Sequence, residues 1–519
     1  MPATLLATLS AALLTSGCSE QVNEWVGPAP ELVFRDDPAT ETLYPPVREA
    51  LAGQMDAAFG QPLQSVAWEA LSSRMHGAVA EVAQEDEDTP TRLEVDLEYE
   101  MAPIEPGQQI VFTLGPNVGA VRQVVDYDAE EEILEIDRPL PEEVDGEMVA
   151  IAPGHVMQTA RPLYARHCQH CHGVTGDGDG PTGWSMDPKP RDFRQGTFKY
   201  TSTRTLYRPA RDDIMRTLEK GIPGTYMPSF HASMDESERA MVTEYVVWLS
   251  SRGEVERRAV AELGDMFGQE VVADFIDDAT DDAIDDLIDE AEENGLELTE
   301  QAARAQLDDD AVREAAMADL DEEWTDYRED FAEEFSDWGS SVGSKWELSE
   351  KKKSVVSPQA ARVAMTDRSV LSGREIYLSN EAKCVSCHGR MGAGNGPQTL
   401  AFQRADDGDG YNDLPGLHDD WGHPIAPRNL QTGIYRGGRR PVDLYRRIYN
   451  GINGAKMPGF GSTLSDEQIW DVVNYVYAVS ENPAINAELD AKIAAKAIAP
   501  PEKAAKASGA IEGETVAVR

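Results

Sequence analysis

The 519-residue sequence is poor in three features: basic residues, long apolar runs and cysteine. It holds 46 lysines and arginines against 94 aspartates and glutamates, a formal net charge of −48. This balance excludes nucleic acid as a partner, because phosphate recognition needs a basic face. No run of twenty apolar residues is present, so the sequence predicts no membrane-spanning helix. Only five cysteines occur in the whole chain, so their positions are informative.

Four of the five cysteines lie in two copies of one pattern, Cys-X-X-Cys-His, at residues 168–172 and 384–388. Two cysteines at this spacing each form a thioether to one porphyrin, and the next histidine is then held under the iron. A thioredoxin-like redox pair or half of a zinc site would explain either cysteine pair, but neither requires that histidine twice. The sequence therefore predicts two covalently bound haem c groups, attached and ligated through Cys168, Cys171 and His172, and through Cys384, Cys387 and His388.

The regions that follow the two patterns align as an internal repeat. Each contains glycine-rich turns, a Gly-Pro pair, a Pro-Arg pair, a Gly-Ile pair and finally a Met-Pro pair. Met227 and Met457 thus fall at matching places, 55 and 69 residues after the histidines of their patterns. A methionine is otherwise a flexible filler of apolar cores. The repeat favours the interpretation of both methionines as iron ligands.

Each repeat unit resembles a class I cytochrome c domain, a helical fold that encloses one haem with histidine and methionine as axial ligands. The resemblance covers residues 155–252 and 368–482. It implies that His172 and Met227 ligate one iron and that His388 and Met457 ligate the other. Such ligation raises the reduction potential above that of a bis-histidine haem and leaves no open position for oxygen or peroxide.

Two further pairs of residues follow from the same resemblance. Pro181 and Pro397 lie in segments similar to the one whose proline carbonyl accepts the second ring N–H of the proximal histidine, which fixes the ring's orientation. Arg191 and Arg428 occupy matching positions, where a guanidinium would pair with a haem propionate or simply be solvated.

Three histidines near the methionines are competing candidates for the distal ligand, namely His231, His418 and His423. The last two lie in an insertion over residues 402–425 that accounts for the greater spacing in the second unit. Its run at residues 406–410 is rich in aspartate and glycine but lacks the EF-hand spacing, so a solvated turn is favoured over a calcium site.

The expected fold class is mainly α, with a small N-terminal β module and an acidic helical insertion. Residues 93–152 contain four or five short β-rich runs separated by turns, which is typical of a small barrel or sheet. The lead at residues 19–92 is expected to be extended with one or two helices. The tail at residues 483–519 is rich in alanine, lysine and proline and is expected to be disordered.

The segment between the two haem units holds much of the negative charge. Residues 254–343 contain 32 acidic against 5 basic residues. Apolar residues recur there at helical spacings, so an acidic helical insertion is expected over residues 253–350. Its role is either that of a solvated spacer or that of a docking surface for a basic partner, whose approach the negative field would accelerate.

The fifth cysteine lies at the end of an apolar N-terminal segment. Residues 1–18 resemble a bacterial signal peptide with a lipobox, in which Cys18 becomes the lipidated first residue of the mature chain. An ordinary cleaved signal peptide and an uncleaved anchor are the alternatives. Export agrees with the haem motifs, since the family that they resemble acquires haem c on the outer side of the cytoplasmic membrane. The expected location is therefore the periplasmic side of a bacterial membrane.

These features together predict a dihaem c-type cytochrome that carries single electrons and is not itself an enzyme. The motif order is similar to that of cytochrome subunits accompanying quinol-oxidising complexes of the alternative complex III type and terminal oxidases. The resemblance implies redox partner proteins of a respiratory chain and no small-molecule substrate. Two alternatives remain open: a dihaem peroxidase-like enzyme, and a haem-bearing structural or assembly subunit of a larger complex.

Overall fold

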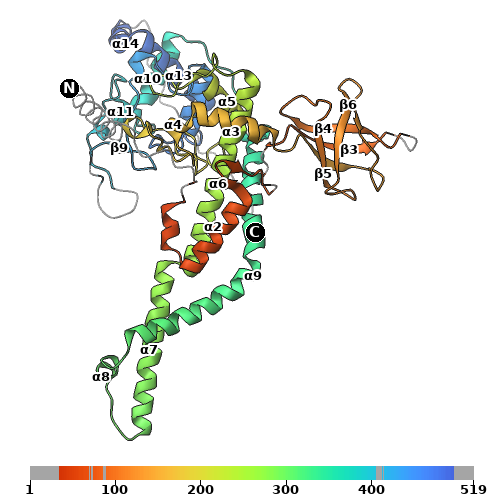
Figure 1. Ribbon diagram of the computed structural model, residues 1–519. Helices are drawn as coiled ribbons and strands as arrows, with labels where there is room; N and C mark the ends of the chain where they lie inside the picture. The colour runs from red at the N-terminus through yellow and green to blue at the C-terminus, as the bar shows by residue number, and fades with distance from the viewer. Residues whose placement is uncertain are drawn as a thin grey trace, which may run out of the picture. The chain divides into compact units, whose positions relative to one another are not determined.

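The computed structural model describes residues 34, 36–68, 70–71, 74–85, 89–404, 412 and 414–495 (Figure 1). The chain divides into two compact units, residues 1–356 and 357–519. The expected signal peptide with Cys18 and the aspartate-rich run at 406–410 lie outside the described residues. Among the described helices, none is both long enough and apolar enough to span a membrane.

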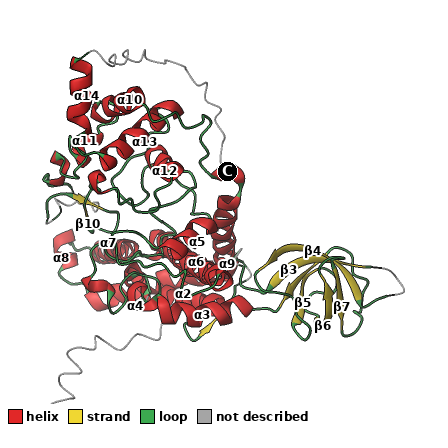
Figure 2. Ribbon diagram, turned by 90° about the horizontal axis from the view of Figure 1, so that it is seen from above, coloured by secondary structure: helices red, strands yellow, loops and turns green. Residues whose placement is uncertain are grey.

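A closed six-stranded antiparallel β-barrel forms part of the first unit (Figure 2). Alternate residues of its strands point inward, as in β4, where Leu93 and Val95 are buried between exposed neighbours. This alternation follows from the two-residue period of a strand. The strands pair in the order β3-β4-β7-β6-β5-β8, which leaves no free edge. Their bounds are β3 (Ala78–Gln84), β4 (Arg92–Glu100), β5 (Gln109–Leu114), β6 (Val121–Asp128), β7 (Ile133–Ile136) and β8 (Glu147–Ile151).

The barrel begins earlier than the sequence predicted. Strands β4 to β8 lie where the five β-rich runs were expected, but β3 lies upstream of residue 93 and closes the barrel by pairing with both β4 and β8. The segment before β3 contains η1 (Pro38–Thr42), α2 (Pro45–Phe59) and a short hairpin. The two strands of this hairpin, β1 (Gly60–Gln61) and β2 (Gln64–Ser65), have two residues each. Helix α2 buries Val47, Leu51 and Phe59 in the core of the first unit.

The first haem motif lies on a set of helices built around α6 (Glu236–Phe267). The other elements are α3 (His155–His167), α4 (Gln169–His172), η2 (Gly183–Ser185) and α5 (Arg211–Lys220), and both α3 and α5 pack on α6. Helix α6 begins at a capping box in which Asp235 accepts from the N–H of Glu238 while the Glu238 side chain accepts from the N–H of Asp235.

Helix α6 corrects the predicted boundary at residue 253, because it continues without a break to Phe267. The acidic segment then forms α7 (Gln269–Glu293), α8 (Glu300–Arg304) and the 42-residue α9 (Asp309–Glu350), followed by η3 (Lys352–Ser354). Helix α9 packs on α7 and on α6 (Figure 1). Its apolar stripe joins the same buried core as α2 and α6, through residues that include Leu320, Trp324, Phe331, Phe335, Trp338, Val342 and Trp346. The acidic segment is therefore part of the first unit's core, not an independent insertion.

The second unit is a separate set of helices in which α10 (Asp367–Leu378) crosses α13 (Asp466–Glu481). A Cβ on Gly373 would lie 2.0 Å from the carbonyl oxygen of Asp471, so glycine permits this close crossing. The remaining elements are α11 (Cys384–His388), η4 (Pro397–Thr399), β9 (Leu417–His418), β10 (Pro424–Ile425), η5 (Leu430–Thr432), α12 (Pro441–Asn450) and α14 (Ile485–Ala494).

Helix α14 corrects the expectation that a disordered tail begins at residue 483. Leu489 on this helix is fully buried, and the hydroxyl of Tyr475 donates to the side-chain oxygen of Asn486 at 3.0 Å. The guanidinium of Arg374 forms an ion pair with Asp490 at 2.7 Å. These contacts attach α14 to α10 and α13, whereas residues 496–519 lie outside the described part of the chain.

Candidate haem-binding sites

The first Cys-X-X-Cys-His pattern forms the single turn of α4 and the residue before it. The N–H of His172 donates to the carbonyl of Cys168 at 2.9 Å, so Cys168, Cys171 and His172 lie on one helical turn. Cys168 is buried, and burial raises the pKa of its thiol to about 12. In the second unit the corresponding residues form α11, where burial raises the pKa of the Cys384 thiol to about 11. None of these four cysteines forms a disulfide.

Glycines downstream of the first pattern bind back to its carbonyls. The N–H of Gly178 donates to His172 at 2.9 Å, and that of Gly180 donates to Cys171 at 3.1 Å. Gly178 has φ +81°, and a Cβ there would lie 2.7 Å from the carbonyl oxygen of Pro190. The spacing of glycines in the repeat therefore reflects a loop that closes tightly over the end of the attachment helix.

The second unit repeats both bonds at matching positions. Gly394 donates to His388 at 2.8 Å, and Gly396 donates to Cys387 at 3.0 Å. A Cβ on Gly394 would lie 2.5 Å from the carbonyl of Pro427. The internal repeat found in the sequence is thus also a repeat of hydrogen bonds.

Each proximal histidine is held by one backbone carbonyl. Nδ1 of His172 lies 3.1 Å from the carbonyl oxygen of Arg191, and Nδ1 of His388 lies 3.0 Å from that of Arg428. The His172 ring also stacks on Phe193, with 4.6 Å between ring centroids. Burial lowers the pKa of His172 to about 4 and lowers that of His388 as well, which favours the neutral form of both imidazoles. A neutral ring that donates from Nδ1 keeps the Nε2 lone pair for a metal.

This geometry corrects one expectation. The carbonyl that orients each histidine belongs to Arg191 or Arg428 and not to Pro181 or Pro397. The arginine follows a second proline of the repeat, Pro190 or Pro427, whereas the Gly-Pro pairs belong to the loop that closes on the attachment helix.

The first methionine lies in a short loop after α5. The N–H of Ile222 donates to the carbonyl of Met227 at 3.1 Å, and the N–H of Met227 donates to Oγ1 of Thr225 at 3.1 Å. The N–H of Phe230 then donates to the carbonyl of Leu218 at 2.8 Å, which ties the loop back to α5. The methionine side chain is half-buried against the core.

The second methionine lies in a loop of the same construction after α12. The N–H of Ile452 donates to Met457 at 3.0 Å, and the N–H of Phe460 donates to Ile448 at 2.9 Å. The two methionines thus have equivalent backbone positions. Their role as iron ligands stays a prediction.

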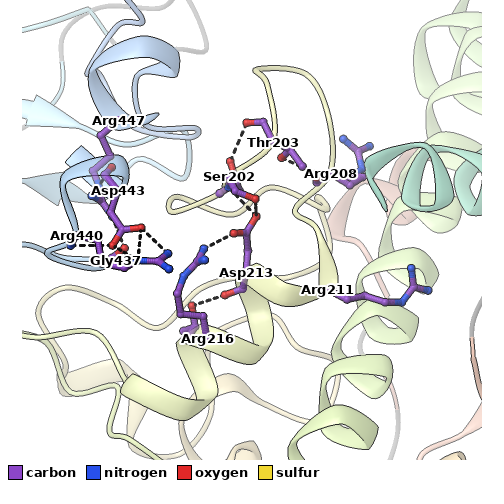
Figure 3. Close-up of polar contacts among 12 residues, drawn as sticks. Ser202, Thr203, Arg208, Arg211, Asp213, Arg216, Gly437, Arg440, Asp443 and Arg447 are labelled. Atoms are coloured by element: carbon purple, nitrogen blue, oxygen red, sulfur yellow. Dashed lines mark hydrogen bonds and ion pairs between the residues drawn. The ribbon is translucent and has the colours of Figure 1, made fainter. Parts of the chain in front are cut away.

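A buried aspartate anchors the helix that precedes each methionine loop (Figure 3). Asp213 in the first turn of α5 accepts from the N–H and hydroxyl of Ser202, at 2.7 and 3.0 Å, and pairs with Arg216. Asp443 in the first turn of α12 accepts from the N–H of Arg440 at 3.0 Å and from its guanidinium at 2.8 Å. Carboxylates at these helix N-termini are also favoured by the helix dipole.

Two tyrosines complete the sites and were missed in the sequence. The Tyr164 hydroxyl donates to the carbonyl of Gly173 at 2.9 Å, and that of Tyr377 donates to Gly389 at 2.6 Å. Each hydroxyl holds the end of its attachment helix against the preceding helix. Tyr164 lies four residues before Cys168, whereas Tyr377 lies seven residues before Cys384. An alignment on the cysteines therefore does not pair the two tyrosines.

The other candidate residues have different environments. The Arg428 Nε donates to the carbonyl of Ile434 at 2.9 Å, and pairing of Arg191 or Arg428 with a propionate stays a prediction. His231 and the His423 imidazole are exposed, whereas His418 is buried. In the described part of the chain, no cluster of three or more His, Cys, Asp or Glu side chains suited to a metal ion is present.

The donor set fits a covalently bound haem in each unit. In each unit two thiols lie on one helical turn, and the next residue is a histidine whose Nδ1 binds a backbone carbonyl. A loop that carries a methionine follows at the matching place in both repeat units. The two cysteines and the histidine of each unit would hold a c-type haem, and the methionine of each loop is the predicted second ligand.

Comparisons with known proteins agree with this class of site. Residues 158–250 match the cytochrome c family, and residues 368–476 match the family described as cytochrome C oxidase, cbb3-type, subunit III. No curated protein matches the chain. A chain of the Kuenenia stuttgartiensis reducing HAO-like protein complex is similar at 23% identity over 62% of this chain and 96% of its own, with a TM-score of 0.37.

The fold and the sites thus define two cytochrome c-type domains. These domains imply covalently bound haem c, and their number fits two haems. The matches support a dihaem c-type cytochrome, a class of electron-transfer protein.

Proposed function

We propose that the protein is an electron carrier and not an enzyme, passing single electrons through two haems that are each ligated by histidine and methionine. The observation that carries the proposal is the repetition of the same backbone hydrogen bonds at both sites, at the histidines and in the two methionine loops. The bound haem supplies Fe(II)/Fe(III) cycling. The chain contributes the axial ligands, the orientation of the histidines and the apolar surroundings that set the potentials.

Carbon monoxide binding tests this proposal against the peroxidase-like alternative. An iron with both axial positions filled by protein side chains does not bind carbon monoxide at neutral pH, whereas a peroxidase-like site needs one open or labile position. We expect the reduced protein to bind none at stoichiometric level, while a spectroelectrochemical titration reports two one-electron steps. Binding of one equivalent by the unmodified protein would refute the carrier.

We also propose that the protein is anchored through a lipidated Cys18 on the periplasmic side of a bacterial membrane. There it would carry electrons from a membrane-bound quinol-oxidising complex to a terminal acceptor such as an oxidase. The lipobox-like sequence at residues 1–18 and the export required for haem c attachment support this location. The 32 acidic residues between 254 and 343 favour partners with a basic docking face.

Fractionation and co-purification from native membranes test the location and the partners. We expect the unmodified chain in the membrane fraction, and a Cys18→Ser variant in the soluble periplasmic fraction or retained as an unprocessed precursor. An unmodified chain that is soluble after cell lysis contradicts the anchor. Purification in mild detergent is expected to retain a quinol-oxidising complex or an oxidase, and isolation without either would contradict the proposed partners.

A further inference from the structure

The second haem unit contains a hairpin that the first lacks. Strands β9 and β10 pair antiparallel, with His418 opposite Pro424, in the segment that makes the second His-to-Met spacing 69 residues instead of 55. The hairpin belongs to the same unit as α11, the attachment helix. The corresponding loop of the first unit, residues 182–190, is short and contains no histidine.

Hydrogen bonds tie the hairpin to both sides of the second haem site. On the histidine side, the N–H of Gly416 donates to Ala401 at 2.9 Å, just after η4 and the loop that closes on α11. On the methionine side, the N–H of Asp420 donates to Gly454 at 3.3 Å, and its carboxylate pairs with Lys456 at 3.4 Å. A porphyrin held between His388 and Met457 would have its edge beside a segment that is tied to the loops of both residues.

His418 and Asp419 are both buried polar residues of this hairpin. His418 as a residue is 5% exposed, and its Nδ1 is buried with no hydrogen-bond partner among the described residues. The neighbouring Asp419 carboxylate instead accepts from the N–H groups of Trp421 and His423, at 3.2 and 3.0 Å. A buried nitrogen left without a partner costs about 1–3 kcal/mol, so its retention in a tied-down hairpin calls for a ligand.

We propose that His418 contacts the second haem, with Nδ1–H donating a hydrogen bond to a propionate. This inference rests on the proposed dihaem assignment. The porphyrin edge is apolar except at its two propionates, which are strong acceptors, so a buried N–H at that edge finds its partner there. His418 is thus a residue that tunes one haem and has no counterpart at the other.

Spectroelectrochemical titration of the full-length dihaem protein tests the contact. A His418→Phe variant keeps a ring of similar size but loses the donor, so the propionate charge stabilises Fe(III) more strongly. We expect one of the two redox steps to shift to lower potential, by up to about tenfold in its equilibrium constant, or ~59 mV. The other step stays in place. The carboxylate bands of the redox-difference infrared spectrum change in the same variant.

Matched variants and a measurement of haem content complete the test. A His418→Gln variant, whose amide can donate, is expected to restore much of the potential, and a His423→Phe variant on the exposed face of the hairpin is expected to shift neither step. Haem content is measured in the unmodified chain and in each variant, since an unmodified chain without two haems contradicts the dihaem assignment itself. Two haems with unshifted potentials in His418→Phe overturn the propionate contact alone. His418 could instead be the axial ligand of the second iron. In that case Met227→Ala would lose the methionine-to-iron charge-transfer band, Met457→Ala would keep it, and His418→Phe would open a coordination site. That combination would also overturn the propionate contact.

Discussion

The two cytochrome domains share one arrangement of hydrogen bonds but are supported by different surroundings. In the first, α6 belongs to a core that also includes α2 and α9, so that the acidic helices support the haem domain. In the second, the domain is a unit by itself, to which the β9–β10 hairpin and α14 also belong. The hydrogen bonds around the attachment motifs are therefore formed by the repeated residues themselves. The elements that pack around each domain and stabilise it differ between the two domains.

An aromatic series shows how the first domain depends on distant sequence. The ring of Phe193, which stacks on His172, lies 5.6 Å from Phe198, and Phe198 lies 6.3 Å from Trp346 near the end of α9. The Trp346 indole also donates to the buried carboxylate of Glu254 at 3.0 Å. A residue 174 positions after the proximal histidine thus takes part in the same packed series of rings.

The largest expected effect comes from removing one attachment motif at a time. A Cys168→Ala/Cys171→Ala variant and a Cys384→Ala/Cys387→Ala variant are each expected to fall from two covalently bound haems to one, because the thioethers cannot form. Pyridine haemochrome content per chain measures this. The remaining redox step assigns one potential to each domain. A variant that keeps two haems, or loses both, contradicts the independence of the two sites.

Removal of one methionine is expected to open one iron. Met227→Ala and Met457→Ala should each bind one equivalent of carbon monoxide when reduced, and each should lower one redox potential, because the weak thioether ligand that favours Fe(II) is gone. Binding at the second site should be slower if the hairpin covers the haem edge there. Flash photolysis of the carbon monoxide complexes measures both. Unchanged spectra in either variant would show that another residue is the distal ligand.

The third effect concerns stability and separates the two units. Trp346→Ala should destabilise the first unit by about 3–5 kcal/mol, because it empties a buried site in the core. Trp470→Ala should do the same to the second unit, where the indole packs on Tyr445 at 4.6 Å and donates to the carbonyl of Ala360. Calorimetry with haem absorbance as a local probe assigns each transition.

The controls for this comparison keep most of the ring volume. Trp346→Phe removes the hydrogen bond to Glu254 but little packing, so a loss of about 1–2 kcal/mol is expected. Each alanine variant should shift one transition only. If Trp346→Ala left the first haem domain unaffected, the acidic helices would be a spacer after all.

The sequence predicted the haem sites better than the parts around them, for physical reasons. The attachment residues have a fixed spacing, and each methionine follows the same order of Gly-Ile and Met-Pro pairs, so the repeat located both groups. The predicted hydrogen-bond acceptor of His172 was wrong because any residue can supply a backbone carbonyl. The repeat also contains two prolines, Pro181 and Pro190, and the sequence does not show which one lies next to the acceptor. Helix α6 was divided at residue 253 because composition changes there although the helical periodicity does not.

Strand β3 and helix α14 were missed because their composition is ambiguous. β3 has three alanines in seven residues, and its place in the barrel depends on pairing with β8, which lies more than sixty residues later. The alanine and lysine content of α14 is that of a solvated tail, yet Leu489 and Asn486 provide enough contacts to hold it. Such long-range partners are invisible to a local pattern.

The smallest expected effect distinguishes the two domains by their response to acid. Burial opposes ionisation of Asp466, but hydrogen bonds from the Tyr445 hydroxyl and from the N–H groups of Ala360 and Gln359 outweigh it and lower the pKa of this carboxyl. A carboxyl with a lowered pKa stabilises the fold above its unfolded value of 3.8, and this contribution is lost as pH falls through the folded pKa.

The first domain has Met215 at the position of Tyr445, so this acid-sensitive contact belongs to the second unit alone. Asp466→Asn should lower the stability of the second unit by about 1 kcal/mol or less at neutral pH, since the site is partly exposed. The variant should also flatten the acid dependence of that transition below pH 3.8. Thermal unfolding followed at several pH values measures this, with Tyr445→Phe as the variant that removes one of the three bonds. An equal flattening of the first unit's transition would show that the acid response belongs to the chain as a whole and not to this contact.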